Sequence, residues 1–162
     1  MAVQFGRRYV MKQIIWTKVF LTIYKRINRI IEEMDNARDG LVRCGFGGGY
    51  NRGLSNEELF EKIIKLNYRR LGLINVKVLV DEGLRRLPQS VREILEARYF
   101  EEDLEGYQNR HGICKRTVFK RLDKATYLLS EVFIKLGYDE KKMNLEYKDE
   151  PLLTKVGKRL EN

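Results

Sequence analysis

The 162-residue sequence has few of the residues that build disulfide frameworks, metal sites or breaks in helices. Its two cysteines, Cys44 and Cys114, are too few and too far apart for a disulfide framework or a thiolate metal site, so we expect both to be reduced. One histidine and no nucleophile–base pattern argue against an enzyme, and we expect no catalytic residue, cofactor or metal. Only Pro88 and Pro151 interrupt the potential for long helices.

A long apolar run is also missing. The most apolar segment, 14–24, contains Lys18, whereas a membrane-spanning helix needs about 20 consecutive apolar residues. No small-residue cleavage site follows the N-terminal arginines, Arg7 and Arg8, so the sequence does not indicate a signal peptide. We therefore expect a cytoplasmic protein without a membrane partner.

Positive charge is what the chain has in excess. Lys and Arg number 32 against 23 Asp and Glu, which gives a formal net charge of +9. Such a balance in a small chain favours a polyanionic partner, above all nucleic acid. Hydrophobic residues make up 43% of the sequence, which is enough for a folded core.

The first half of the chain holds two amphipathic segments on either side of a glycine-rich stretch. Six glycines predict a flexible loop at 40–54. The segment 10–38 before it has no Gly or Pro, and its apolar residues repeat with the spacing of one helical stripe: Trp16, Phe20, Ile23, Ile27, Ile30 and Met34.

The second segment begins with a capping box, Ser55 to Glu58, and its apolar stripe continues to about Arg86. Two long helices joined by one loop most simply pack as an antiparallel hairpin. We therefore expect residues 1–86 to form a long helical hairpin that mediates homo-oligomerisation or contact with another partner.

Residues 87–137 have the layout of a helix-turn-helix. The acids at 101–103 open one helix, and Gly112 supplies the tight bend before a last helix near 114–128. That last helix carries a regular apolar stripe, which we expect to be buried: Val118, Leu122, Ala125 and Leu129. The fold class that follows is all-α, with a hairpin followed by a helix-turn-helix.

The outer positions of the helix near 114–128 are basic. From 106 to 124 the chain carries six basic residues and one acid, a net charge of +5 in 19 residues. A helix with a basic outer face fits the major groove of double-stranded DNA. We expect Lys115, Arg116 and Thr117 to meet base edges, and a second basic set to neutralise phosphates: Arg110, Lys120, Arg121 and Lys124.

Two runs in this region, Val91–Phe100 and Gly112–Ala125, resemble region four of bacterial sigma factors. The region is also similar to the small sigma-like transcription regulators of Gram-positive bacteria and their phages. The resemblance implies a phage- or prophage-encoded regulator whose last helix reads promoter DNA in the bacterial cell and whose module also touches RNA polymerase. Gln108, His111 and Cys114 depart from the family, which usually has alanine, leucine and serine there.

Two other functions remain open on the residues alone. One is DNA packaging or assembly, as in a small terminase subunit, which also combines a helix-turn-helix with oligomerisation. The other is a helical interaction protein whose helix-turn-helix no longer binds DNA. The mixed-charge tail, 138–162, is expected to be a solvated terminus with at most a short helix near Pro151, and His111 is expected to be a partly buried packing residue.

Overall fold

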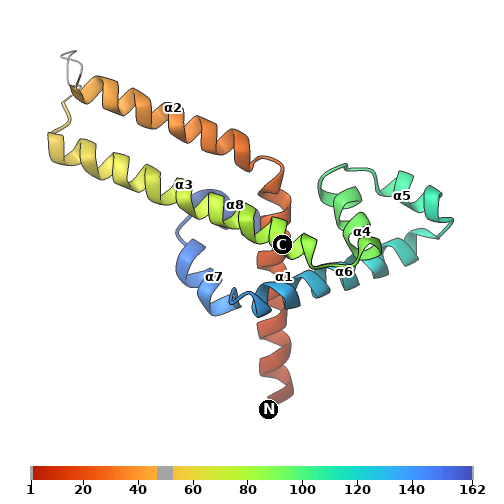
Figure 1. The fold of residues 1–162 in the computed structure, drawn as a ribbon. Helices are drawn as coiled ribbons and strands as arrows, with labels where there is room; N and C mark the ends of the chain where they lie inside the picture. The colour runs from red at the N-terminus through yellow and green to blue at the C-terminus, as the bar shows by residue number, and fades with distance from the viewer. Residues whose placement is uncertain (1, 47–52, 162) are drawn as a thin grey trace. The chain divides into compact units, whose positions relative to one another are not determined.

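The computed structural model describes residues 2–46 and 53–161 of the chain (Figure 1). These residues contain helices and no strand, which confirms the all-α fold class. None of the helices is long and apolar enough over its described residues to cross a membrane. In chain order the helices are α1 (Ala2–Tyr24), α2 (Ile27–Phe46), α3 (Asn56–Arg85), α4 (Gln89–Tyr99), α5 (Leu104–His111), α6 (Lys115–Lys135), α7 (Glu140–Tyr147) and α8 (Pro151–Glu161).

The helices group into two compact units. One comprises Met1–Lys25 with Val78–Asn162, and the other comprises Arg26–Lys77, so α3 begins in the second unit and ends in the first. This grouping differs from the division expected from the sequence at 86/87 and 137/138. The difference arises because the first and last parts of the chain pack together.

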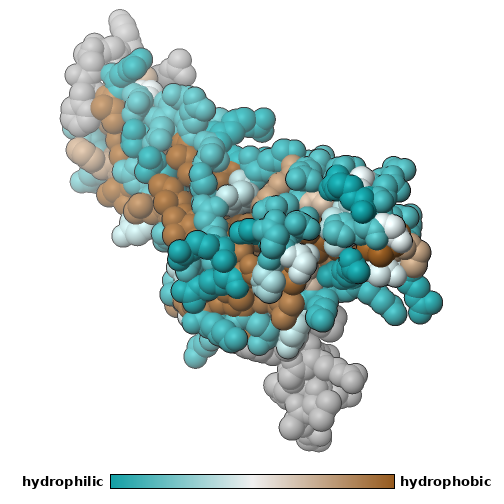
Figure 2. Space-filling view, turned by 45° about the vertical axis from the view of Figure 1, so that its right-hand side comes forward, coloured by the Kyte–Doolittle hydropathy of each residue, from teal (hydrophilic) through white to brown (hydrophobic). Residues whose placement is uncertain are grey.

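The Arg26–Lys77 unit consists of α2 and most of α3, which lie side by side (Figure 1). Arg70 Nε lies 2.8 Å from Asp35 Oδ1, and Lys77 Nζ donates to Asn28 Oδ1 over 2.7 Å. Lys77 follows Arg70 along α3, whereas its partner Asn28 precedes Asp35 along α2, so the two helices run antiparallel. Figure 2 shows apolar side chains gathered at the surface of this unit.

The start of α3 has the geometry that its sequence predicts. The Glu58 backbone N–H donates to Ser55 Oγ over 3.2 Å, and the Ser55 N–H donates to Glu58 Oε2 over 2.7 Å. Each side chain thus accepts from the backbone of the other, which satisfies donors that the first turn of a helix leaves without partners. The predicted capping box is confirmed.

The loop expected at 40–54 is wrong in its first part, because α2 continues through Gly40 and Gly45 to Phe46. Residues 47–52 of that prediction lie outside the described residues. A Cβ atom built on Gly45 would lie 2.1 Å from Leu59 Cδ2. The glycine lets α2 approach α3 closely, and this packing offsets the cost of about 1 kcal/mol for glycine in a helix.

The single helix expected over 10–38 is also wrong. A turn at Lys25 and Arg26 separates α1 from α2, although neither residue is a helix breaker. The apolar stripe itself is real, and Phe20, Ile23 and Ile27 are buried. The stripe divides between the two units, so tertiary packing overrides the local preference for one continuous helix.

The unit that contains α1 has its core where α1 meets α6, α7 and α8. The Phe20 ring lies 6.2 Å from that of Phe133 on α6 and packs edge-on against Tyr147 on α7 at 5.3 Å. Met143 and Leu153, on α7 and α8, are fully buried. The short helix expected near Pro151 is confirmed by α8. The expectation of a solvated tail at 138–162 is wrong, because this segment supplies apolar side chains that cover α1.

Candidate nucleic-acid interface

The basic segment singled out in the sequence lies in a three-helix arrangement of α4, α5 and α6. Figure 1 shows α4 and α5 on the N-terminal half of α6, and α4 packs against both other helices. Ile94 and Leu95 of α4, Tyr107 of α5 and Val118 and Leu122 of α6 are buried. This small core fixes the direction in which α6 presents its remaining side chains.

Helix α5 begins and ends as the sequence predicts. Asp103 is its N-cap, and its Oδ1 accepts from the Gly106 backbone N–H over 2.8 Å. At the other end, Gly112 adopts φ +59°, in the left-handed region that favours glycine. The Ile113 N–H then donates to the Gln108 carbonyl over 3.3 Å, which closes the bend before α6 starts at Lys115.

Helix α6 separates apolar from basic residues. The predicted apolar stripe is confirmed, because each of its members is buried: Val118, Leu122, Ala125 and Leu129. Opposite this stripe, Arg116, Lys120 and Lys124 follow one another at intervals of four residues and therefore share one face. Lys115, the first residue of α6, and Arg121 lie to the sides of the helix rather than on this face, and all five basic side chains are exposed.

We call these five basic residues the α6 basic face: Lys115, Arg116, Lys120, Arg121 and Lys124. They form no ion pair with any residue that the structure describes. Arg110 of α5 differs, since its guanidinium lies 3.5 Å from Asp103 Oδ2 and 3.9 Å from Glu101 Oε2. Asp123, the one acid among them along the chain, is also exposed. The α6 basic face therefore keeps a net positive charge, which raises the local potential for an anionic partner.

Thr117 has a different environment from its basic neighbours. It is half-buried, and its Oγ1 lies 3.2 Å from Sγ of Cys114, the N-cap residue of α6. The hydrogen bond from Thr117 lowers the pKa of the exposed Cys114 thiol. The Thr117 hydroxyl therefore contacts Cys114 within the first turn of α6. The sequence alone had placed Thr117 among the residues that meet base edges.

The two other departures from the sigma-like pattern lie on α5. The His111 ring contacts that of Tyr107 at a tilt of 38°, with ring centroids 4.3 Å apart, and its Nε2 lies 3.8 Å from Glu93 Oε2. Its side chain is 37% exposed, so it packs on one side and faces solvent on the other. Gln108 is half-buried. The bend at Gly112 forms with both residues in place, since the Gln108 carbonyl accepts from the Ile113 N–H.

Two exposed aromatic residues on α6, Phe119 and Tyr127, were missed in the sequence. Their exposure could have been expected from helical spacing, because neither falls in the buried stripe of α6. Phe119 lies between Val118 and Lys120 in the sequence, and Tyr127 is seven residues, or about two helical turns, beyond Lys120. They add flat apolar surface to a face that is otherwise basic.

No group of three His, Cys, Asp or Glu side chains among residues 2–46 and 53–161 is arranged to hold a metal ion. The described helices thus define an all-α chain with a basic, solvent-facing helix after a tight glycine bend. Searches against protein-family models, curated proteins and solved structures found no match to this chain.

Proposed function

We propose that the protein is a sequence-specific DNA-binding transcription regulator of the sigma-factor-like type. The observation that carries the proposal is the α6 basic face, whose five side chains are exposed and form no ion pair with described residues. Many other arginines of the chain are held by acids, as Arg38, Arg70 and Arg86 are. Cations kept free on one helix are suited to bind phosphates.

In this proposal α5, the bend at Gly112 and α6 act as a helix-turn-helix. The N-terminal turn of α6 enters the major groove, where Lys115 and Arg116 meet base edges. Phe119 offers an apolar surface of the kind that contacts a thymine methyl group. Farther along α6, Lys120, Arg121 and Lys124 bind phosphates. Arg110 of α5 joins them if the duplex displaces its carboxylate partners, Asp103 and Glu101.

The direct test starts from DNA that co-purifies with the intact protein at moderate salt, whose sequences identify a target duplex. Binding of that duplex is then compared between the wild type and a Lys115→Ala/Arg116→Ala double variant. We expect the variant to lose specific binding while its circular dichroism and thermal unfolding stay unchanged, because both side chains are exposed. Unchanged affinity in the folded variant would contradict the proposal.

RNA polymerase contact is a second part of the proposal, and it follows from the sigma-like sequence of α4 and α6. A pull-down of bacterial RNA polymerase by the wild type and by the Lys115→Ala/Arg116→Ala variant separates this contact from DNA binding. Retention of polymerase by both proteins would support a surface separate from the α6 basic face, whereas no retention by either would remove polymerase from the proposal.

A homo-oligomer through the N-terminal half is supported by the outer face of α3. Ile64, Tyr68 and Leu71 are 52, 74 and 54% exposed, and with Asn75 they follow the alternating 4 and 3 spacing of a coiled-coil seam. An asparagine at one seam position sets register and favours pairing with an equivalent helix. We propose that the partner at this seam is a second copy of the chain.

Native mass measurement distinguishes this regulator from the DNA-packaging alternative. A dimer fits two helix-turn-helix modules that read two half-sites. A closed ring of many copies would favour packaging, because rings arise from heterologous contacts that close on themselves. A Tyr68→Glu/Leu71→Glu variant should be monomeric, and its persistence as the wild-type oligomer would contradict the α3 seam.

A further inference from the structure

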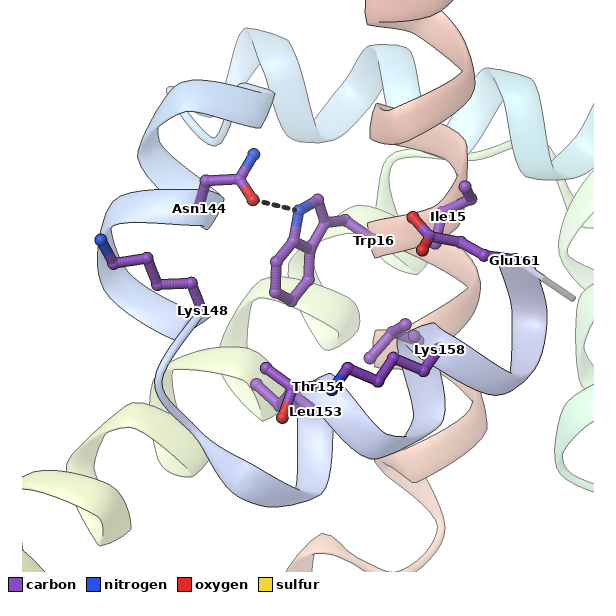
Figure 3. Close-up of a pocket in the computed structure, with 10 residues that line it drawn as sticks. Ile15, Trp16, Asn144, Lys148, Leu153, Thr154, Lys158 and Glu161 are labelled. Atoms are coloured by element: carbon purple, nitrogen blue, oxygen red, sulfur yellow. Dashed lines mark hydrogen bonds between the residues drawn. The ribbon is translucent and has the colours of Figure 1, made fainter.

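A pocket of about 300 Å³ lies between α1, α7 and α8, away from the α6 basic face (Figure 3). This volume is at the lower end of the range of about 300–1,000 Å³ for small-molecule sites. Its walls combine an aromatic ring, aliphatic side chains and two lysines, notably Trp16, Val19, Leu153, Lys148 and Lys158. All of its lining residues belong to one compact unit.

The aromatic wall is held in a fixed orientation. The Trp16 indole N–H donates to Asn144 Oδ1 over 3.3 Å, and Asn144 Nδ2 in turn donates to the Glu140 carbonyl over 2.9 Å. The indole also packs against Phe20 and Tyr147, with ring centroids 5.9 and 6.5 Å away. Figure 3 shows the ring projecting between α7 and α8. Such a preorganised aromatic surface favours a planar ligand that stacks on it.

Gly157, in the middle of α8, also lines the pocket. Glycine at such a position costs about 1 kcal/mol relative to alanine. A Cβ atom built there would make only an ordinary contact, 3.7 Å from Val19 Cγ2, so helix packing does not demand a glycine. What the missing side chain provides is space beside Val19 in the pocket.

The charge at the pocket is positive. Lys148 and Lys158 line it together with one acid, Glu161, and neither lysine forms an ion pair with a residue in the described part of the chain. Figure 3 shows the Lys158 side chain running along α8 beside Leu153 and Thr154. A ligand here would therefore meet an apolar floor and a cationic group, which suits a flat molecule with one negative charge.

We propose that this pocket binds a small aromatic carboxylate, whose ring stacks on Trp16 and whose carboxylate pairs with Lys158. The proposal does not depend on DNA binding. The experiment uses the flat carboxylate 4-methylbenzoate as probe, and its readout is the emission of Trp16, which is the chain's single tryptophan. We expect a saturable change in emission with this probe and none with the neutral isostere 4-methylbenzamide.

Two pairs of variants locate the site. Lys158→Gln should bind the probe about fivefold more weakly, as expected for one exposed charge pair, whereas Lys155→Gln should bind like wild type because Lys155 lies on α8 outside the pocket. Gly157→Leu should fill the pocket and abolish the response, whereas Gly157→Ala should retain it.

Three outcomes would overturn the proposal: no saturable response in the wild type, equal binding of the amide and the carboxylate, or equal weakening by the Lys158 and Lys155 variants. Thermal unfolding of each variant shows whether it is folded. If Gly157→Leu fails to fold, the comparison of Lys158→Gln with Lys155→Gln still tests the site. Both lysines are exposed and form no ion pair with described residues, so neither variant should unfold.

Discussion

The α6 basic face leads to a quantitative prediction for the salt dependence of DNA affinity. Each phosphate that a protein neutralises contributes about −0.9 to the slope of log affinity against log salt concentration. Lys120 and Lys124 are exposed, one helical repeat apart and without ion pairs to described residues. A Lys120→Gln/Lys124→Gln variant should therefore have a slope shallower by about 1.8, while its stability changes by no more than about 0.5 kcal/mol.

The assay is fluorescence anisotropy of a labelled target duplex over a series of salt concentrations. Its control is a Lys62→Gln/Lys141→Gln variant, which removes two exposed lysines from α3 and α7 and so lowers the formal net charge from +9 to +7, as the α6 variant does. The control slope should equal that of the wild type. Equal flattening in both variants would show that only net charge matters, and no flattening in either would refute phosphate contact by these lysines.

Three further predictions concern stability and reactivity. A Cβ atom on Gly83 would lie 2.6 Å from a buried ring of α6, so Gly83→Leu should lower the free energy of unfolding in urea by about 2 kcal/mol or more; an unchanged midpoint would contradict this packing. Thr117→Val removes the hydrogen bond that lowers the pKa of the Cys114 thiol, so alkylation of Cys114 at neutral pH should slow, and an equal or faster rate would contradict this cause. Burial, aided by Asp81, raises the pKa of Tyr24 from 10.0 to about 12. The stability that this shift contributes is present below pH 10 and is lost as the pH rises toward 12. Tyr24→Phe should therefore lose less thermal stability at alkaline pH than the wild type, and parallel curves of melting temperature against pH would contradict this.

Local sequence patterns predicted local structure well. The capping box at Ser55, the bend at Gly112 and the buried stripe from Val118 to Leu129 each depend on neighbours within a few residues, and each is present. The break at Lys25 could not be predicted, because it is produced by packing rather than by a breaker residue. The same holds for Gly45, which continues α2 because Leu59 lies against it.

The candidate interface was predictable in composition and less so in detail. Charge counting found the basic residues of α6, and helical spacing placed Arg116 and Lys120 on its outer face. Spacing could not reveal that Arg110 pairs with Asp103, or that Thr117 contacts Cys114, since these contacts depend on side-chain conformations at the two helix starts. The pocket at Trp16 was equally hidden, because α1 is far in the sequence from α7 and α8, which complete it.

Thiol footprinting on the complex with DNA tests most directly whether the duplex binds at α6. Both cysteines are free and exposed, Cys114 at the start of α6 and Cys44 on α2, so one is a probe of the interface and the other an internal control. Saturating target duplex should strongly slow alkylation of Cys114 and leave the rate at Cys44 unchanged. Bound duplex that leaves Cys114 fully reactive, or that protects only Cys44, would contradict the placement of DNA on α6.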